Sequence, residues 1–351
     1  MSSRNPYYIS FGRIPTQYIS RGIIIDSIIE TLESDVVEEQ AFKLTGIRGT
    51  GKTVTLTAIE RRICENSDWI VVDLKSNGNI TEDLIAELYS RIPFVMDFVD
   101  CELNLSKFGI GLTASLKSPV ASIDHALREI LNVIKKKGKR ILVVIDEARR
   151  TSAMVDFIQE FQILIREEMP IYIMVAGLYE DIEGLENTEG LTFFLRATKY
   201  EMTPLNFTSI RNDYENTLQV KREVAEKMAY ITKGYAFAYQ ALGKYMWDEK
   251  ADDVTDTILQ KLDEALAEKV YNKIWSELTP NDCMYLRYLA QKQEMSATEL
   301  LELTHKKHNE WSEPRKRLRE KGIIDVSTRG IIKMRLPRMK EYIENYQTYQ
   351  Y

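Results

Sequence analysis

The residues most able to do chemistry form a glycine-rich stretch that ends in a lysine and a threonine. Residues 46–53 read Gly-Ile-Arg-Gly-Thr-Gly-Lys-Thr and fit the pattern G-x-x-x-x-G-K-S/T. In such a stretch the glycines let successive backbone N–H groups approach a phosphate closely. The lysine then reaches the β- and γ-phosphates, and the threonine hydroxyl binds Mg²⁺. The alternative is a glycine turn that ends in Lys-Thr without any ligand.

The flanking residues match the setting that this chemistry requires. Ala41–Leu44 predicts a short strand, and Thr53–Glu65 predicts a helix, because Leu56, Ile59 and Ile63 are spaced three and four apart. Strand, glycine-rich turn and helix in this order are the context of a phosphate-binding loop. We therefore expect ATP to be contacted by Gly46, Ile47, Arg48, Gly49, Thr50, Gly51, Lys52, Thr53 and Val54.

A second motif, which ends in two acidic residues, supplies the carboxylate that a nucleotide site needs to bind its metal. Residues 140–147 form an unbroken apolar run that ends in two carboxylates, Asp146 and Glu147. Such a run suits a strand buried on both faces of a parallel sheet. We expect Asp146 to bind Mg²⁺ together with Thr53, and Glu147 to polarise the attacking water as general base. The alternative is a buried strand followed by an acidic helix cap.

Two further apolar segments indicate the fold class. Trp69–Leu74 lies between the glycine-rich stretch and the acidic strand, and Ile171–Gly177 follows the acidic strand. A strand inserted between the two motifs is typical of P-loop sheets with an additional strand. We expect an α/β fold, with a parallel sheet covered by helices on both faces, that hydrolyses ATP with its own glutamate.

Length and composition exclude several classes of protein. The chain has 351 residues, enough for two domains or three small ones. Its 44% hydrophobic and 28% charged residues match a globular protein. Apolar runs such as Ile171–Ala176 are far shorter than the roughly 20 residues of a membrane-spanning helix. The first residues lack the apolar core of a secretory signal. We expect a cytoplasmic protein without membrane contact.

Cysteines and histidines do not suggest a disulfide framework or a transition-metal centre. Cys64, Cys101 and Cys283 are odd in number and widely separated. The close pair His305 and His308 flanks two lysines, whose charge would repel a cation.

Positive charge is concentrated near the C-terminus. Residues 305–340 hold twelve lysines and arginines against four acids, a net charge of +8, which leaves −14 for the rest of a chain whose total is −6. An acidic body with a basic C-terminal module is typical of a nucleic-acid-binding appendage.

The pattern of this module predicts a winged helix. We expect helices over about 281–293, from 296 and over about 314–321, followed by strands over 323–326 and 331–336. The third helix of related folds enters the major groove of duplex DNA. The expected DNA contacts, mainly to phosphates, are Arg315, Lys316, Arg317, Arg319 and Arg329. The alternative is a protein-binding winged helix whose basic face is only solvated.

With these motifs in this order, the chain resembles the AAA+ ATPases. More narrowly it resembles the initiator class related to origin-recognition and replication-loader ATPases, including bacterial members carried on mobile elements. Pro15–Arg21 is similar to the motif that packs near the adenine, with Arg21 at its usual arginine, and Val175–Leu178 is similar to the first sensor strand. Phe193–Ala197 resembles the segment with the arginine finger, a role that would fall to Arg196 and would require oligomers. The alternative is a surface arginine paired with an acid.

The resemblance implies an α/β nucleotide-binding domain over 1–205, a helical lid over 206–276 and a winged helix over 277–351. Two departures bear on the rate of hydrolysis: Ala176–Gly177 stands where a polar first sensor is usual, and Phe237 stands where an arginine follows Gly234. We expect slow hydrolysis by a nucleotide-controlled switch that oligomerises and binds duplex DNA. The alternatives are a STAND-type signalling ATPase that recruits protein, and a target-selecting ATPase of a transposition system.

One remaining segment alternates with a two-residue period. Leu103–Leu116 predicts a β-hairpin inserted before the acidic strand, with contact to DNA or to a neighbouring subunit as the hypothesis and an idle surface hairpin as the alternative.

Overall fold

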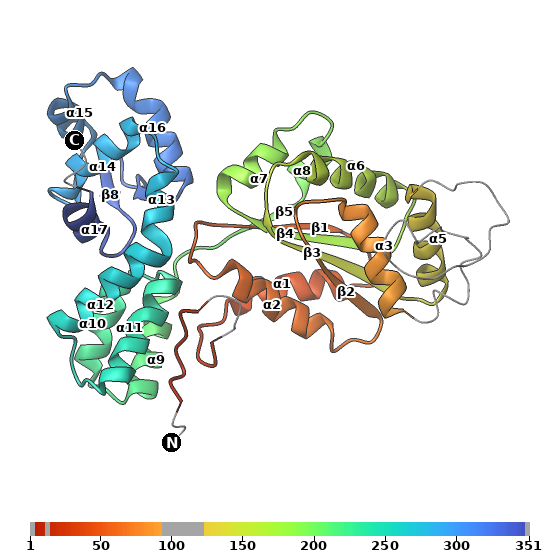
Figure 1. The fold of residues 1–351 in the computed structure, drawn as a ribbon, viewed down its shortest axis with the longest axis horizontal. Helices are drawn as coiled ribbons and strands as arrows, with labels where there is room; N and C mark the ends of the chain where they lie inside the picture. Colours follow the sequence, from red (N-terminus) through yellow and green to blue (C-terminus); the bar gives the residue numbers. More distant parts are fainter. Residues whose placement is uncertain (1–3, 11–14, 93–122, 348–351) are drawn as a thin grey trace. The chain divides into compact units, whose positions relative to one another are not determined.

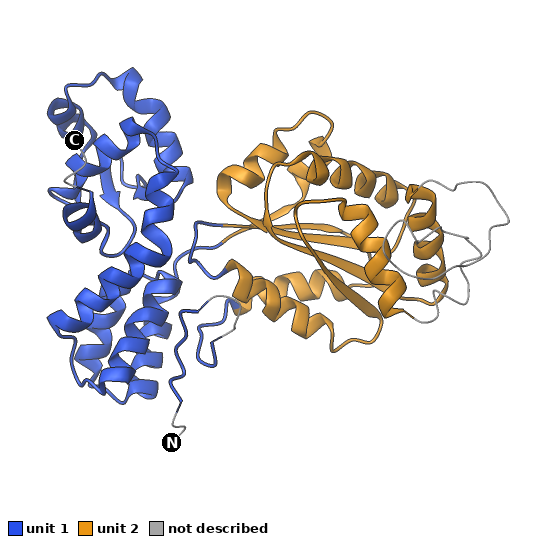
Figure 2. Ribbon diagram, in the orientation of Figure 1, with its two compact units in different colours: residues 1–21, 46–51, 202–351 blue, residues 22–45, 52–201 orange. Residues whose placement is uncertain are grey.

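The computed structural model describes residues 4–10, 15–92 and 123–347, so the predicted hairpin at 103–116 lies outside the described residues. The chain divides into two compact units (Figure 2). Unit 1 comprises residues 1–21, 46–51 and 202–351, and unit 2 comprises residues 22–45 and 52–201. The division places the glycine-rich stretch up to Gly51 in unit 1, and Lys52 begins a helix of unit 2.

Unit 2 contains a parallel five-stranded sheet in the order β2-β3-β4-β1-β5. The strands are β1 (Ala41–Thr45), β2 (Trp69–Leu74), β3 (Arg140–Ala148), β4 (Ile171–Gly177) and β5 (Thr198–Glu201). The first four confirm the strands predicted from the sequence. The fifth, β5, was not predicted, because four residues that alternate between half-buried and exposed positions give little pattern to detect.

Helices cover both faces of this sheet, which confirms the predicted fold class (Figure 1). One face packs against α1 (Gly22–Glu33) and α2 (Lys52–Ile63). The other packs against α3 (Ile80–Arg91), α5 (Ile123–Lys136) and α6 (Ser152–Arg166). Every residue of Ile141–Ile145 is buried, because successive side chains of β3 point to opposite faces and both are covered.

The parallel arrangement gathers the polar ends of the strands at one edge. In the pairing register, Leu74 lies opposite Ile145, and Ile145 lies opposite Val175. Asp146 and Glu147 therefore follow at the carboxyl edge, where parallel α/β sheets bind ligands. The short helices α7 (Tyr179–Glu186) and α8 (Thr192–Arg196) complete the unit.

The part of unit 1 from residue 202 begins with α9 (Phe207–Leu218), α10 (Arg222–Thr232), α11 (Ala236–Glu249) and α12 (Asp256–Leu266). The N-terminal segment is held by α9 and α11. Asp213 is the centre of this attachment. Its carboxylate accepts hydrogen bonds from Tyr7 Oη at 2.7 Å, from Tyr239 Oη at 2.6 Å and from the Gln17 amide. These bonds bring a segment far away in the sequence onto α9 and α11.

The C-terminal part of unit 1 begins after η2 (Ala267–Tyr271) and α13 (Asn272–Ser276). It contains α14 (Pro280–Ala290), α15 (Ala297–Thr304), α16 (His308–Glu320) and α17 (Met339–Tyr346). Strands β6 (Glu294–Ser296), β7 (Ile324–Asp325) and β8 (Ile331–Met334) form an antiparallel sheet in the order β6-β8-β7. Helix α16 starts six residues before the predicted 314, since Pro314 is accommodated inside it. None of the described helices is both long enough and apolar enough to cross a bilayer.

Candidate functional site

The glycine-rich loop of residues 46–51 has four consecutive carbonyl groups that are all hydrogen-bonded. Ile47 O accepts from Thr50 Oγ1 at 2.9 Å, and Arg48 O accepts from Tyr235 Oη at 2.5 Å. Gly49 O accepts from the Phe237 backbone N–H at 2.9 Å. Thr50 O accepts from Arg21 Nη2 at 3.0 Å. A trans peptide carries its N–H opposite its carbonyl, so this arrangement turns the N–H groups of residues 48–51 to the other side.

The residues at the start of α11 lie so close to the loop that only glycine fits at position 49. Gly49 has a φ of +76°, and a Cβ at this position would lie 2.4 Å from Tyr235 Oη. Tyr235 is almost fully buried, and burial raises its pKa, which keeps the phenol protonated as a donor. The expected second-sensor position, Phe237, therefore serves the loop through its backbone N–H and not through a side chain.

Unit 2 brings together the predicted metal-binding residues. Thr53 Oγ1 on α2 donates a hydrogen bond to Asp146 Oδ2 at 2.6 Å, and the Glu147 N–H donates to Asp146 Oδ1 at 2.8 Å. A hydroxyl and a carboxylate side by side are hard oxygen donors that suit Mg²⁺, which takes its remaining ligands from phosphate and water. In the part of the chain that the structure describes, no three His, Cys, Asp or Glu side chains form a metal cage of their own.

A β-bulge interrupts the pairing of β3 at the two carboxylates. The register between β3 and β4 shifts between Ile145 and Ala148, so Asp146 and Glu147 leave the ladder. Glu147 has a φ of +51°, an unusual backbone conformation for a residue with a side chain. Ser76 Oγ holds it there by donating to the Glu147 carbonyl at 3.0 Å. The Glu147 side chain is 55% exposed, with Arg149 Nη2 at 3.8 Å from Oε2.

The structure explains why no polar first sensor stands at the end of β4. A Cβ on Gly177 would lie 2.8 Å from the Ala148 carbonyl oxygen. Ala148 is the residue that resumes pairing with Gly177 after the bulge. The bulge at Asp146 and Glu147 thus excludes a side chain at Gly177, and Ala176 is buried.

The remaining predicted residues lie apart from these groups in the sequence. Arg196 ends α8 and is exposed, and it has no polar partner among the described residues. On α16, Arg315 is exposed, whereas Lys316 and Arg319 lie near Glu320 at 4.0 and 3.2 Å.

Arg317 is engaged inside its own domain. Its guanidinium donates from Nε and Nη2 to the two carboxylate oxygens of Asp282, both at 2.8 Å, and Asp282 is fully buried. Such a bidentate pair between α16 and the first turn of α14 fixes the two helices. Arg329, in the turn between β7 and β8, is exposed.

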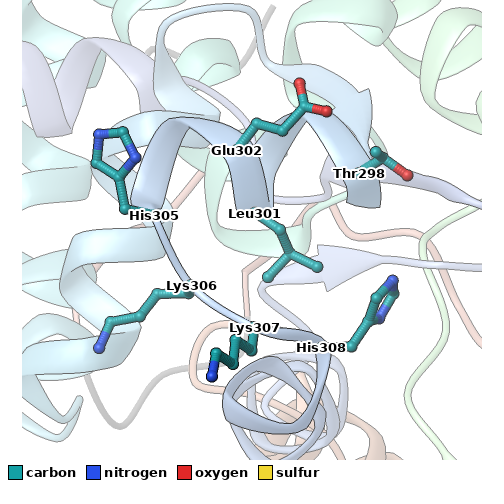
Figure 3. Close-up of a pocket in the computed structure, with 7 residues that line it drawn as sticks. All are labelled: Thr298, Leu301, Glu302, His305, Lys306, Lys307 and His308. Atoms are coloured by element: carbon teal, nitrogen blue, oxygen red, sulfur yellow. The ribbon is translucent and has the colours of Figure 1, made fainter.

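A shallow basic hollow of about 580 Å³ lies where α15 turns into α16 (Figure 3). Figure 3 shows His305 and His308 on opposite sides of it, with Lys306 and Lys307 between them along the turn. Lys306 Nζ contacts Glu310 at 2.9 Å. The lining residues are Thr298, Leu301, Glu302, His305, Lys306, Lys307 and His308.

The groups that position the motifs were not predicted from the sequence. Tyr235 and the Phe237 N–H hold the loop, and Ser76 holds the backbone of Glu147. The position of the Gly234–Phe237 segment, where the second sensor is expected, could have indicated that these residues lie near the loop. Ser76 carries no signal that a single sequence reveals.

Comparisons with known proteins agree with this fold. A family profile described as "Domain of unknown function (DUF8462)" matches residues 268–343. No curated protein matches the sequence. Among solved structures, the Walker-type ATPase PABY2304 of Pyrococcus abyssi is similar with a TM-score of 0.63 and 17% identity, over 93% of this chain and 95% of that one. The ORC2 protein of Aeropyrum pernix, in ADPNP–ADP complexes, is similar with a TM-score of 0.59 and 13% identity, over 96% of each chain. At these identities the likeness shows the fold alone.

A half-buried carboxyl, that of Glu60, lies near Asp146. Burial, reinforced by the nearby carboxylates of Asp73 and Asp146, raises the pKa of Glu60 on α2 from 4.5 to about 8. Glu60 and Asp73 also share a hydrogen bond. The folded protein therefore keeps a proton on Glu60 at neutral pH, a proton that the unfolded chain has lost.

The stability of the protein should fall as the pH rises through this range. Between about pH 5 and pH 8 the folded state binds more protons than the unfolded state, so the free energy of unfolding decreases with pH. We expect Glu60→Gln to flatten this slope, and Asp73→Asn to reduce it only in part, since burial is the larger cause. Urea unfolding at pH 5.5, 7.0 and 8.5 in magnesium-free buffer measures the slopes. An unchanged slope in Glu60→Gln would contradict the assignment.

Proposed function

We propose that this chain is an ATPase switch of the AAA+ type. It binds Mg²⁺-ATP at residues 46–53, hydrolyses ATP slowly, assembles with copies of itself and binds duplex DNA through its C-terminal module. The names of two proteins with this fold are consistent with the proposal, since one is called a Walker-type ATPase and the other was solved with ADPNP and ADP.

The observation that carries the proposal is the set of four bonded carbonyls at residues 47–50. Their partners hold the loop in one conformation and turn the opposite N–H groups towards the side where a phosphate would bind. The loop continues directly into α2, whose first residues are Lys52 and Thr53. Backbone N–H groups, a helix N-terminus and an ammonium group together favour a polyphosphate.

Thr53 and Asp146 are the residues that would hold the metal. When bound, Mg²⁺ would neutralise charge on the phosphates. Glu147 follows Asp146 at the same strand end, where the bulge and Ser76 hold its backbone, and it would accept a proton from water. Neither Gly177 nor Phe237 offers a side-chain charge or dipole to the transition state, and for this reason we infer slow turnover.

Self-assembly is inferred from the exposure of Arg196. Its side chain is exposed at the end of α8 and is not used within the described part of its own chain. An arginine in this state is available to the nucleotide of a second copy, where it would stabilise charge on the transferred phosphoryl group.

DNA binding is inferred from the C-terminal module. Its three helices α14, α15 and α16, followed by the β7–β8 ribbon, have the order of a winged helix. Arg315, Lys316, Arg319 and Arg329 are exposed and would contact phosphates. Arg317 is left out of this set because Asp282 engages it.

A second candidate is a STAND-type signalling ATPase. The missing arginine at Phe237 favours it, since nucleotide exchange would then matter more than hydrolysis. In that case the C-terminal module would recruit a protein.

Two substitutions test the nucleotide site. Lys52→Ala should weaken Mg²⁺-ATP binding about 100-fold, because it removes the charge that meets the β- and γ-phosphates. Glu147→Gln should keep the affinity and lower kcat by about 10²–10⁴-fold, because it removes the base. Calorimetric titration and a phosphate-release assay measure the two quantities. Normal turnover by Glu147→Gln would refute the role of the base.

The bond from Tyr235 to the loop makes a separate prediction. Tyr235→Phe leaves Arg48 O without its protein donor, so we expect Mg²⁺-ATP to bind about 3- to 10-fold more weakly, a loss of ~1 kcal/mol. Tyr271→Phe is the matched control: it removes a buried phenol that donates to the backbone carbonyl of Pro337 and not to the loop. Equal affinities of the two variants in calorimetry would contradict the proposed preorganisation.

The DNA proposal predicts a salt-dependent interaction. Fluorescence anisotropy with a labelled duplex, at 50–200 mM salt, should give a dissociation constant that rises steeply with salt. Arg315→Ala/Arg329→Ala should weaken binding and lower the logarithmic salt slope by about 1.8, since each lost phosphate contact contributes about 0.9.

The control for this experiment removes the same charge elsewhere. Lys136→Ala/Arg166→Ala changes two exposed cations of unit 2 and should leave DNA binding unchanged. If wild-type protein does not bind the duplex at 50 mM salt, with or without Mg²⁺-ATP, the DNA proposal fails and the signalling candidate is favoured.

A further inference from the structure

A lysine is fully buried on β1, the strand next to the edge strand β5 of the parallel sheet. Lys43 lies in the middle of β1, between β4 and β5, and its side chain is 0% exposed. Its ammonium group donates to Glu186 Oε1 at 2.8 Å. It also donates to the backbone carbonyl of Phe194 at 2.5 Å, and it lies 3.4 Å from the carbonyl of Leu195. None of these contacts reaches the residues of the metal-binding pair.

The two carbonyls belong to the last turn of α8, directly before Arg196. Helix α8 has five residues, and Phe194 is its buried anchor, with its ring 4.9 Å from Lys43 Nζ. The two residues that follow point outward: Leu195 is 59% exposed, and Arg196 is exposed. Lys43 thus fixes the backbone at the end of α8, the short helix on which Leu195 and Arg196 are exposed.

Stability alone does not explain a charge at this position. Replacing a buried ion pair by well-packed apolar residues is often neutral or stabilising, because desolvation offsets the attraction between the charges. Burial lowers the pKa of Lys43, and the Glu186 carboxylate opposes that shift. What an apolar residue cannot supply is a donor for the α8 carbonyls. The ammonium group, with its three donors, satisfies them and the carboxylate together.

We propose that Lys43 is a positioning residue for Arg196, holding the end of α8 so that this arginine reaches the nucleotide of a second copy of the chain. The inference rests on the proposed function, in which Arg196 acts between subunits. Lys43 itself does not touch the substrate. Its effect is on the rate of hydrolysis in the neighbouring subunit, because transition-state charge is stabilised only by a group held in the right place.

The chain contains a matched control for this role. Lys199 on β5 also pairs with Glu186, at 3.0 Å from Oε2, and no bond from it to the α8 carbonyls is seen in the described structure. Lys43→Met therefore removes both the charge and the support of α8, whereas Lys199→Met removes a charge from the same carboxylate only. We expect Lys43→Met to lower kcat at least tenfold without changing the dissociation constant of Mg²⁺-ATP, and Lys199→Met to behave like the wild type.

Mixing subunits distinguishes positioning from general damage. A Glu147→Gln subunit cannot hydrolyse ATP and has an intact Arg196, and an Arg196→Ala subunit has the opposite defect. The Arg196→Ala and Glu147→Gln mixture should recover activity, and so should the Lys43→Met and Glu147→Gln mixture. The Lys43→Met and Arg196→Ala mixture should not recover, because both subunits lack a positioned arginine.

The outcomes separate the two claims. If Arg196→Ala does not recover with Glu147→Gln, the action of Arg196 between subunits is wrong, and the role of Lys43 falls with it. If Arg196→Ala recovers and Lys43→Met does not, or if Lys43→Met alone has wild-type kcat, only the Lys43 inference is overturned.

A second variant covers the case in which Lys43→Met does not fold. Lys43→Met/Glu186→Leu removes the buried carboxylate as well as the lysine and leaves Lys199 near the surface. Circular dichroism and thermal unfolding check its fold. The same tenfold loss and the same recovery with Glu147→Gln are expected, and wild-type activity in this folded double variant would overturn the inference.

Discussion

The carbonyl groups of a glycine-rich loop need hydrogen-bond donors that hold them on one side before the backbone N–H groups can bind an anion on the other. In this chain Tyr235, the Phe237 N–H and Arg21 supply three of them, and Thr50 supplies the fourth. Every peptide that is bonded through its carbonyl has its N–H turned to the opposite side. The conformation of the loop therefore depends on contacts within unit 1, and Gly49 must be glycine because Tyr235 occupies the space of a side chain.

Charged side chains of the same type have different tasks according to their burial. Lys43 and Arg317 are both paired with buried carboxylates, and each fixes one element against another. Arg196 and Arg315 are exposed and have no such partner among the described residues. Buried pairs define where elements lie, and exposed cations remain available to ligands. The bulge at Glu147 also depends on a contact between two elements, because Ala148 leaves no space for a side chain at Gly177 on β4.

The sequence predicted those features that depend on local pattern. The loop at 46–53, the β3 run and the capping of α15 by Ser296 have residue types at fixed spacing, and four of the five strands of the parallel sheet lie where expected. Features that depend on contacts between distant segments were not predicted. The bonds of Tyr235, the support from Ser76 and the pairing of Arg317 with Asp282 join residues 187, 71 and 35 positions apart. Lys43 was visible as a charge inside an apolar strand, but its partners were not.

The central claim is that the backbone N–H groups of this loop bind the phosphates of ATP. Hydrogen–deuterium exchange on the full chain, with and without saturating Mg²⁺-ATP, tests it directly. If the phosphates bind there, amides in the peptide that covers residues 48–53 exchange at least several-fold more slowly in the presence of the nucleotide. Unchanged exchange in that peptide at saturating Mg²⁺-ATP would contradict the claim, whatever protection occurred elsewhere in the chain.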